Sequence, residues 1–238
     1  MNEKVLDIVR AVQQAGGRAF IVGGWVRDRL LGHESKDVDI EVFGVPADRL
    51  RDLLASIGRV EAVGESFQVY KCGDIDVTLP RRESKAGRGH RGFVVTGDPS
   101  MSVEDAARRR DFTVNAISFD PLSGEYLDPF DGRTDLARRV LRVVDPERFG
   151  DDSLRVLRAV QFAARFNLSV DPLTRDICRG IALDDLPAER ILGRSGEAAL
   201  GATAVDRPRP RARSRHRPAA VARAACSRRL PAGTGVAP

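Results

Sequence analysis

Two acidic residues separated by one position are the first side chains in the sequence that could do chemistry. Asp37 and Asp39 lie in segment 36–44, in which aliphatic and acidic residues alternate. A period of two predicts a strand with one acidic face, on which both carboxylates project to the same side. Mg²⁺ binds one or two carboxylates and completes its shell with water and phosphate oxygens. The pair therefore predicts a magnesium site, with a solvated acidic strand face as the alternative.

A glycine pair precedes the acidic strand by about a dozen residues. Gly23 and Gly24 stand between the apolar run 18–22 and the sequence WVRDRLLG, so we expect a strand, a tight turn and a helix. Free N–H groups and the dipole at a helix start favour a phosphate, and Arg27 can add a charge-assisted hydrogen bond to it. With the acidic pair, the turn predicts a triphosphate site opposite a metal site. A turn that only reverses the chain is the alternative.

The elements that must position these residues follow from periodicity. A first helix, ending at Gly16, is predicted by apolar residues spaced along one helical face: Val5, Ile8, Val9 and Val12. Beyond the acidic strand we expect a helix at 47–57, strands at 67–72, 74–79 and 93–95, and a mobile, basic, glycine-rich loop at 81–92. From about Phe149 the pattern becomes helical, and helices are expected over LRVLRAVQFAARF (154–166) and near 173–183 and 188–199. The first of these three carries its apolar residues on one broad side: Leu154, Leu157, Val160, Phe162 and Ala164. This order of elements predicts an α+β domain with a helical extension.

Charge is distributed unevenly along the 238 residues. The net charge of +5 and the pI of about 9.5 suggest an acidic partner such as nucleic acid. However, residues 201–238 hold nine arginines and one acid, so residues 1–200 carry a net charge of −3. Because the tail has arginine at every odd position from 207 to 217 and no aromatic residue, we expect it to be disordered.

Composition excludes several classes of protein. The chain is 42% hydrophobic and 31% charged, which excludes a fully disordered or integral membrane protein. Its three cysteines form neither a paired motif nor a metal-ligand pattern with histidine. There is no apolar run of about 18 residues for a membrane span and no apolar stretch typical of a signal peptide. We expect a cytoplasmic protein without a membrane partner; the sequence indicates no oligomeric state.

Four segments carry a resemblance to a known family. GGWVRDRLLG and KDVDIEVFG together resemble the first motif of the class II tRNA nucleotidyltransferase and bacterial poly(A) polymerase family. RRDFTVNAI (109–117) resembles its ribose- and triphosphate-contacting segment, DPFDGRTDLARRVLR (128–142) its hinge, and DDSLRVLRAVQFAARF (151–166) its base-recognition helix. The resemblance runs from about residue 18 to 192. It implies a polymerase-beta-like nucleotidyltransferase palm, with a mixed sheet and flanking helices, followed by a small helical neck.

The domain boundaries expected from this resemblance are a catalytic head at 1–145, a truncated neck at 146–200 and the tail at 201–238. Segment 186–201 starts like the next family motif and then departs from it. Since shifted frames of GC-rich genes are rich in Arg, Ala, Pro and Gly, we hypothesise a frameshift from about residue 193. A natural basic arm that binds RNA backbone through counterion release is the alternative.

The resemblance also implies a set of catalytic residues. Asp37 and Asp39 match the metal ligands, and Asp76 matches a third carboxylate, although Asp74 is expected on the same strand face. The implied reaction is nucleotidyl transfer with two Mg²⁺ ions: one activates the attacking 3′-hydroxyl and the other neutralises the leaving pyrophosphate.

Two residues of the second motif match nucleotide contacts. Arg110 matches a nucleotide-contacting arginine, and Asp111 is placed to accept a hydrogen bond from a ribose hydroxyl. Asn115, in the same motif, is interpreted as a structural bridge within the turn.

The base-recognition helix implies which nucleotides are selected. Cytosine and adenine both present an amino donor beside a ring-nitrogen acceptor, whereas uracil and guanine present a carbonyl beside a ring N–H. Asp152 and Arg155, three apart on one helix face, match the pair that accepts C and A. Arg158 matches a nucleotide-contacting arginine, and Gln161 stands where many members have a phosphate-binding arginine. Asp151 replaces the usual glutamate.

The implied function is addition of C and A from CTP and ATP to the 3′ end of tRNA, without a template. Alternatives within the family are a poly(A) polymerase and an enzyme that adds only A or only CC. Segment 63–77, VGESFQVYKCGDIDV, resembles the CCA-adding form more than the basic form of poly(A) polymerases. Alternatives outside it are an inactive nucleotide-binding remnant and a basic RNA-binding module that acts through its tail.

Overall fold

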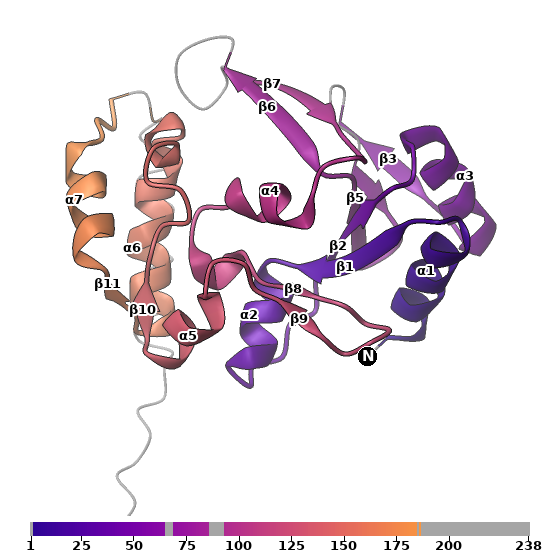
Figure 1. Cartoon of the computed structure of the whole chain (residues 1–238), viewed down its shortest axis with the longest axis horizontal. Helices are drawn as coiled ribbons and strands as arrows, with labels where there is room; N and C mark the ends of the chain where they lie inside the picture. The colour runs from indigo at the N-terminus through magenta and orange to yellow at the C-terminus, as the bar shows by residue number, and fades with distance from the viewer. Residues whose placement is uncertain (1, 65–68, 86–92, 185, 187–238) are drawn as a thin grey trace, which may run out of the picture. The chain divides into compact units, whose positions relative to one another are not determined.

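A mixed β-sheet is the centre of the fold. The computed structural model describes residues 2–64, 69–85, 93–184 and 186. Within these residues seven strands form one sheet in the order β3-β4-β5-β2-β1-β8-β9 (Figure 1). Their bounds are β1 Arg18–Val22, β2 Val38–Phe43, β3 Glu61–Val63, β4 Val69–Lys71, β5 Ile75–Thr78, β8 Ser118–Phe119 and β9 Tyr126–Leu127. β2 and β5 are parallel, and the other pairs are antiparallel. The predicted α+β class with a mixed sheet is confirmed.

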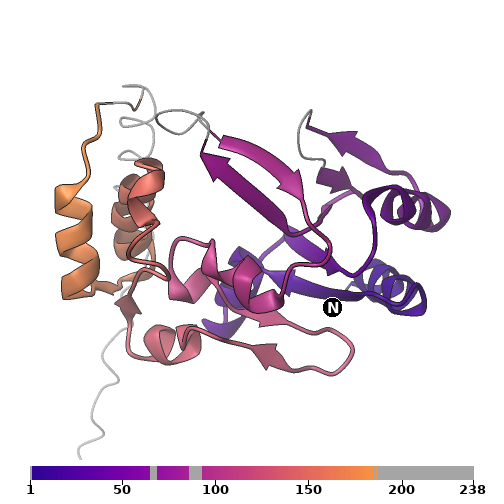
Figure 2. The ribbon, with the colours of Figure 1, turned by 45° about the horizontal axis from the view of Figure 1, so that its top comes forward.

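Helices α1 (Glu3–Gln14) and α3 (Ala47–Ile57) lie side by side against the sheet (Figures 1 and 2). The apolar face predicted for the first helix is confirmed, since all four of its residues are at most 2% exposed: Val5, Ile8, Val9 and Val12. They pack with Leu50 and Leu54 of α3 and with sheet residues such as Ile40. Burial of this face, at about 25 cal/mol per Å² of apolar surface, anchors the strands that carry the acidic residues.

A second core joins the predicted head to the predicted neck. Phe112 packs on Phe149 and Phe162, with ring centroids 5.5 and 5.9 Å apart. The elements around it are α2 Gly24–Leu30, η1 Thr113–Asn115, α5 Gly132–Ala137, β10 Val140–Leu141, η2 Phe149–Asp151, α6 Leu154–Phe166, β11 Ser169–Val170 and α7 Pro172–Gly180. Helix α4 (Val103–Arg108) instead packs through Ala106 in a smaller cluster with Phe20 and Phe43. Residues before and after position 145 therefore share one core, and the boundary placed there stays a prediction. No helix in the described part of the chain is long and apolar enough to cross a membrane.

Three expectations about local structure were wrong. Part of the loop expected at 81–92 is a strand: β6 (Arg81–Lys85) pairs with β7 (Phe93–Gly97), and 86–92 lie outside the described residues. A backbone ladder needs no apolar period, so composition alone missed it. The base-recognition helix, which the resemblance places from residue 151, begins only at Leu154, as the apolar periodicity predicts.

The third error concerns the buried face of α6, because Val160 is 57% exposed. Phe162 and Phe166, one turn apart, define the buried face, and Val160 is offset from Phe162 by about half a turn. The helix expected at 188–199 and the tail from 201 lie outside the described residues.

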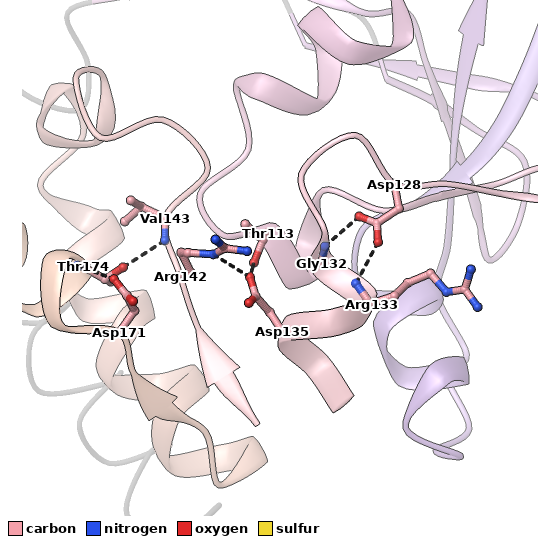
Figure 3. Close-up of polar contacts among 9 residues, drawn as sticks. All are labelled: Thr113, Asp128, Gly132, Arg133, Asp135, Arg142, Val143, Asp171 and Thr174. Carbon is pink, nitrogen blue, oxygen red and sulfur yellow. Dashed lines mark hydrogen bonds and ion pairs between the residues drawn. The ribbon is translucent and has the colours of Figure 1, made fainter. Parts of the chain in front are cut away.

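Hydrogen bonds of the Asp135 carboxylate and the Thr174 hydroxyl hold the predicted hinge and the residue that follows it (Figure 3). The Asp135 carboxylate accepts from the Thr113 hydroxyl at 2.6 Å and from Arg142 Nε at 2.9 Å. Further along the chain, the hydroxyl of Thr174, a fully buried residue, accepts from the backbone N–H of Val143 at 3.0 Å. These bonds tie the predicted hinge to η1 on one side and to α7 on the other.

Gly132, at the start of α5, lies where no side chain fits. Its backbone N–H donates to Asp128 at 2.7 Å, and a Cβ atom there would lie 2.1 Å from the Thr113 carbonyl oxygen. We therefore expect Gly132→Ala to lower the free energy of unfolding by about 1–3 kcal/mol, the usual cost of overpacking. Urea unfolding followed by circular dichroism measures this change. In the control Gly180→Ala, nothing lies within 4 Å of the new methyl group, and equal stability of the two variants would contradict the prediction.

Candidate active site

The register of two parallel strands brings the predicted carboxylates together. Asp39 on β2 lies opposite Asp76 on β5, and Asp37 immediately precedes β2. Desolvation raises the pKa of the Asp39 carboxyl above its ordinary value, and the charges of Asp76 and Asp37 add to this, whereas Arg110 opposes it. The carboxylates of Asp37, Asp39 and Asp76 therefore repel one another, and a cation bound near them would relieve this repulsion.

Asp76 already has a cationic partner. Lys71 lies opposite it on β4, and its ammonium donates to the two carboxylate oxygens at 2.8 and 2.9 Å. The hydrogen bond and charge of Asp76 raise the pKa of Lys71. Sequence reasoning missed Lys71, although its place in the strand before Asp76 was a usable signal. Asp74, expected on the same strand face, instead lies in the bend before β5.

The acidic side chains fit a magnesium site with only one or two protein ligands. Among the described residues, no group of three or more acidic, histidine or cysteine side chains is gathered closely enough to hold a metal ion. Asp37 and Asp39 supply the one or two carboxylates that Mg²⁺ needs when water and phosphate oxygens complete its shell. The donor set thus suits a cation that arrives with a phosphorylated substrate better than a closed protein cage.

The glycine turn, an arginine and an acid converge at the end of β1. Gly23 has a φ of 70° and a ψ of −133°, a conformation that favours glycine. A Cβ atom there would lie 3.4 Å from Arg110 Nη1 and 3.6 Å from Asp39 Oδ2. The predicted turn before a helix is therefore present, with Gly24 as the first residue of α2, and the backbone at Gly23 stays bare between a positive and a negative group.

A buried glutamate orients Arg110. Glu41 is 6% exposed and accepts from Arg110 Nη2 at 3.2 Å. It lies two residues after Asp39 on β2, so both project from the same strand face. Sequence reasoning did not select Glu41: the alternation marked the face, but only the tertiary structure decides that this member of the face is covered.

Arg27 is an interior residue in this structure. It is 6% exposed, and burial lowers its pKa, against the opposing charge of Asp28. Its guanidinium donates to Asp28 Oδ1 at 2.9 and 2.7 Å and to Asn115 Oδ1 at 2.8 Å. It also lies 4.2 Å from the ring centroid of Phe166. Arg27 thus links α2 to the second core, and its predicted phosphate contact stays a prediction.

Asp111 and Arg158 form an ion pair between the second motif and α6. Arg158 Nε donates to Asp111 Oδ2 at 2.6 Å, and Asp111 is 7% exposed. Gln161 is half-buried on the same helix, three residues further along. The two predicted nucleotide-contacting motifs are therefore in direct contact.

Asp152 and Arg155 are neighbours, but not on one helix face as predicted. Asp152 has extended backbone before α6, and its carboxylate accepts from the N–H of Leu154 at 3.0 Å. Its carbonyl accepts from the N–H of Arg155 at 3.1 Å. The Arg155 guanidinium donates to the carbonyl oxygens of Arg109 at 2.9 Å and Arg148 at 3.3 Å. The helix starts later than predicted because this carboxylate binds a free N–H of its first turn.

Comparison with known proteins decides the family. The Poly A polymerase head domain matches residues 19–142, more than half of the chain. The chain belongs to the class II CCA-adding enzyme and poly(A) polymerase family. The family predicted from the four motifs is thereby confirmed.

Relatives of this family match most of the chain. It is 42% identical over 184 residues to the Multifunctional CCA protein of Stenotrophomonas maltophilia (strain R551-3), covering 73% of this chain and 44% of the relative. The Xylella fastidiosa (strain M23) protein of the same name is 40% identical, with coverages of 73% and 42%. The chain thus spans less than half the length of these relatives.

Solved structures of a CCA-adding enzyme and a tRNA nucleotidyltransferase are also similar to this chain. The Bacillus stearothermophilus CCA-adding enzyme in complex with CTP has a TM-score of 0.68 and 31% identity, over 82% of this chain and 48% of that one. A tRNA nucleotidyltransferase complexed with a primer tRNA and an incoming ATP analog has a TM-score of 0.65 and 29% identity, over 82% and 58%.

The raised pKa of Asp39 predicts a pH-dependent stability difference. When a carboxyl has a higher pKa in the folded state, its ionisation destabilises that state at neutral pH. We therefore expect Asp39→Asn to raise the Tm at pH 7. The gain should vanish below about pH 3.9, the pKa of an unperturbed aspartate, since both states are then protonated.

Thermal unfolding of both proteins from pH 3 to 8 measures this difference. Glu34→Gln, which removes an exposed carboxylate upstream of β2, serves as the control and should leave the Tm unchanged. A Tm gain of Asp39→Asn that is the same at every pH would contradict the prediction.

Proposed function

We propose that this chain is the nucleotide-binding and catalytic part of a cytoplasmic, template-independent nucleotidyltransferase that adds C and A from CTP and ATP to the 3′ end of tRNA. The observation that carries the proposal is the convergence of Asp39, the bare backbone at Gly23 and Arg110 at one end of the sheet. An acid that suits a cation and a guanidinium that suits a phosphate lie there side by side.

Asp37 and Asp39 would hold Mg²⁺ in this site, with Asp76 as the neighbouring third carboxylate. Two bound ions would lower the pKa of the attacking 3′-hydroxyl and neutralise the leaving pyrophosphate. Arg110, already oriented by Glu41, would bind a triphosphate oxygen beside the turn at Gly23. The slightly acidic net charge of residues 1–200 suits a site that recruits its cations with the substrate.

Selection of C and A would come from Asp152 and Arg155. Their carboxylate and guanidinium complement the amino donor and ring-nitrogen acceptor that the two bases share. Arg158 and Gln161, further along α6, would contact the same nucleotide.

An incorporation assay tests the function directly. The purified chain is incubated with tRNA lacking its terminal CCA, Mg²⁺ and each labelled nucleoside triphosphate in turn. Addition of C and then A supports the proposal. Long A tracts would identify a poly(A) polymerase instead, and absence of incorporation with retained ATP binding would identify an inactive remnant.

The acidic pair gives a first test at residue level. We expect Asp37→Ala and Asp39→Ala each to reduce incorporation by a factor of about a thousand or more, as is typical for essential catalytic groups. Asp74→Ala, which removes the nearby acid in the bend before β5, should retain incorporation. Metal-dependent incorporation by the double variant Asp37→Ala/Asp39→Ala would refute the assignment.

The base-selecting pair gives a second test. Since a good bidentate pair contributes about 1–3 kcal/mol of discrimination, we expect Asp152→Ala/Arg155→Ala to lower selectivity against UTP and GTP by about 5- to 150-fold. Affinity for the triphosphate itself should change less. Competition binding of the four nucleotides measures both, with the exposed α7 variant Arg175→Ala as control. If the double variant still discriminates against U, the pair does not select the base.

A further inference from the structure

Asn115 lies between two charged side chains in the interior. It is 5% exposed and ends the 3-10 helix η1. Its side-chain oxygen accepts from Arg27 Nη1 at 2.8 Å, and its side-chain nitrogen donates to Asp111 Oδ1 at 3.0 Å. The amide therefore connects α2 of the sheet domain with the segment that contacts α6.

The orientation of this amide is fixed by its neighbours. A guanidinium can only donate hydrogen bonds, and an ionised carboxylate can only accept them. The Asn115 oxygen must face Arg27 and its nitrogen must face Asp111. Arg27 in turn is held by Asp28 and by stacking on Phe166, so the amide has a rigid support.

The contacts of Asp111 leave one position open. Its Oδ1 accepts from Asn115 and from the backbone N–H of Phe112 at 2.8 Å, and its Oδ2 accepts from Arg158 Nε at 2.6 Å. A carboxylate has about four lone-pair positions. Among the contacts formed within the described residues, three are occupied, and the fourth is on Oδ2 beside Arg158.

We propose that Asn115 is a positioning residue for sugar recognition. By occupying Oδ1, it holds the Asp111 carboxylate so that only Oδ2 can accept a ribose hydroxyl, next to the guanidinium of Arg158. The inference rests on the proposed function and on the role that the sequence predicts for Asp111, which is to accept a hydrogen bond from a ribose hydroxyl. Asn115 itself does not touch the nucleotide.

Substitution by aspartate separates positioning from packing. Asn115→Asp has nearly the same shape and keeps the acceptor for Arg27, but it replaces the donor 3.0 Å from Asp111 with a second acceptor. Like charges at that distance repel, so Asp111 must turn away. Asn115→Ala removes the hydrogen bond to Asp111 Oδ1 without adding a charge. It therefore tests the proposal even if the aspartate variant does not fold.

Equilibrium binding of CTP and dCTP to the full chain measures the effect, because only CTP carries the 2′-hydroxyl. We expect the wild-type preference for CTP to fall about 3- to 10-fold in Asn115→Ala, the usual effect of one hydrogen bond, and to disappear in Asn115→Asp. If Asn115 had a purely structural role, its substitution would weaken the binding of CTP and dCTP equally and leave the ratio of their affinities unchanged. Thr113→Val, which removes a buried hydroxyl of the same turn that bonds Asp135, should lower the Tm and preserve the ratio.

The binding results test the role of Asp111 in ribose recognition separately from the role of Asn115 in positioning it. A wild-type chain that binds CTP no better than dCTP contradicts the assignment of Asp111 to the ribose. A wild-type preference that both Asn115 variants retain overturns the role of Asn115.

A thermal double-mutant cycle tests the positioning without nucleotide. Because Asn115 and Arg158 act on the same buried carboxylate, the Tm loss of Asn115→Ala/Arg158→Ala should differ from the sum of the two single losses. Additive losses would overturn the inference.

Discussion

The parallel pairing of β2 with β5 imposes the constraint to which the rest of the site responds. It sets Asp39 opposite Asp76, and because Asp37 lies two residues before Asp39, like charges are brought together at one end of the sheet. Such a cluster is unfavourable unless cations lie nearby. Two neighbouring residues supply them: Lys71 pairs with Asp76, and the positive charge of Arg110 opposes the rise in the pKa of Asp39.

The same constraint explains why the site remains open. Lys71 neutralises Asp76 from the neighbouring strand, while Asp37 and Asp39 have no comparable salt bridge among those found in the described residues. These two carboxylates are therefore available to a cation that a phosphorylated substrate brings.

A second principle unites the head with α6: buried charge must be paired. Arg27 is satisfied by Asp28 and Asn115, and Asp111 by Asn115 and Arg158. This chain of hydrogen bonds crosses the region where a domain boundary was expected. It connects the glycine turn to α6, so one polar network holds together the two halves of the proposed nucleotide site.

Local periodicity in the sequence determined the strands and helices that have a buried face, as the first helix and the acidic strand show. Four motifs in order determined the family. Periodicity did not reveal β6, whose pairing depends on the backbone, or the exposure of Val160, which depends on where the phenylalanines of α6 pack.

For the site, the sequence determined the acidic pair, the glycine turn and the arginines by type and spacing. Only the tertiary structure decided that Glu41 is covered, that Lys71 meets Asp76 and that Arg27 is an interior residue. The physical reason is that charge pairing and desolvation depend on distances between segments far apart in the chain. Spacing along the sequence reports only which side of a strand or helix a residue occupies, not what lies opposite it.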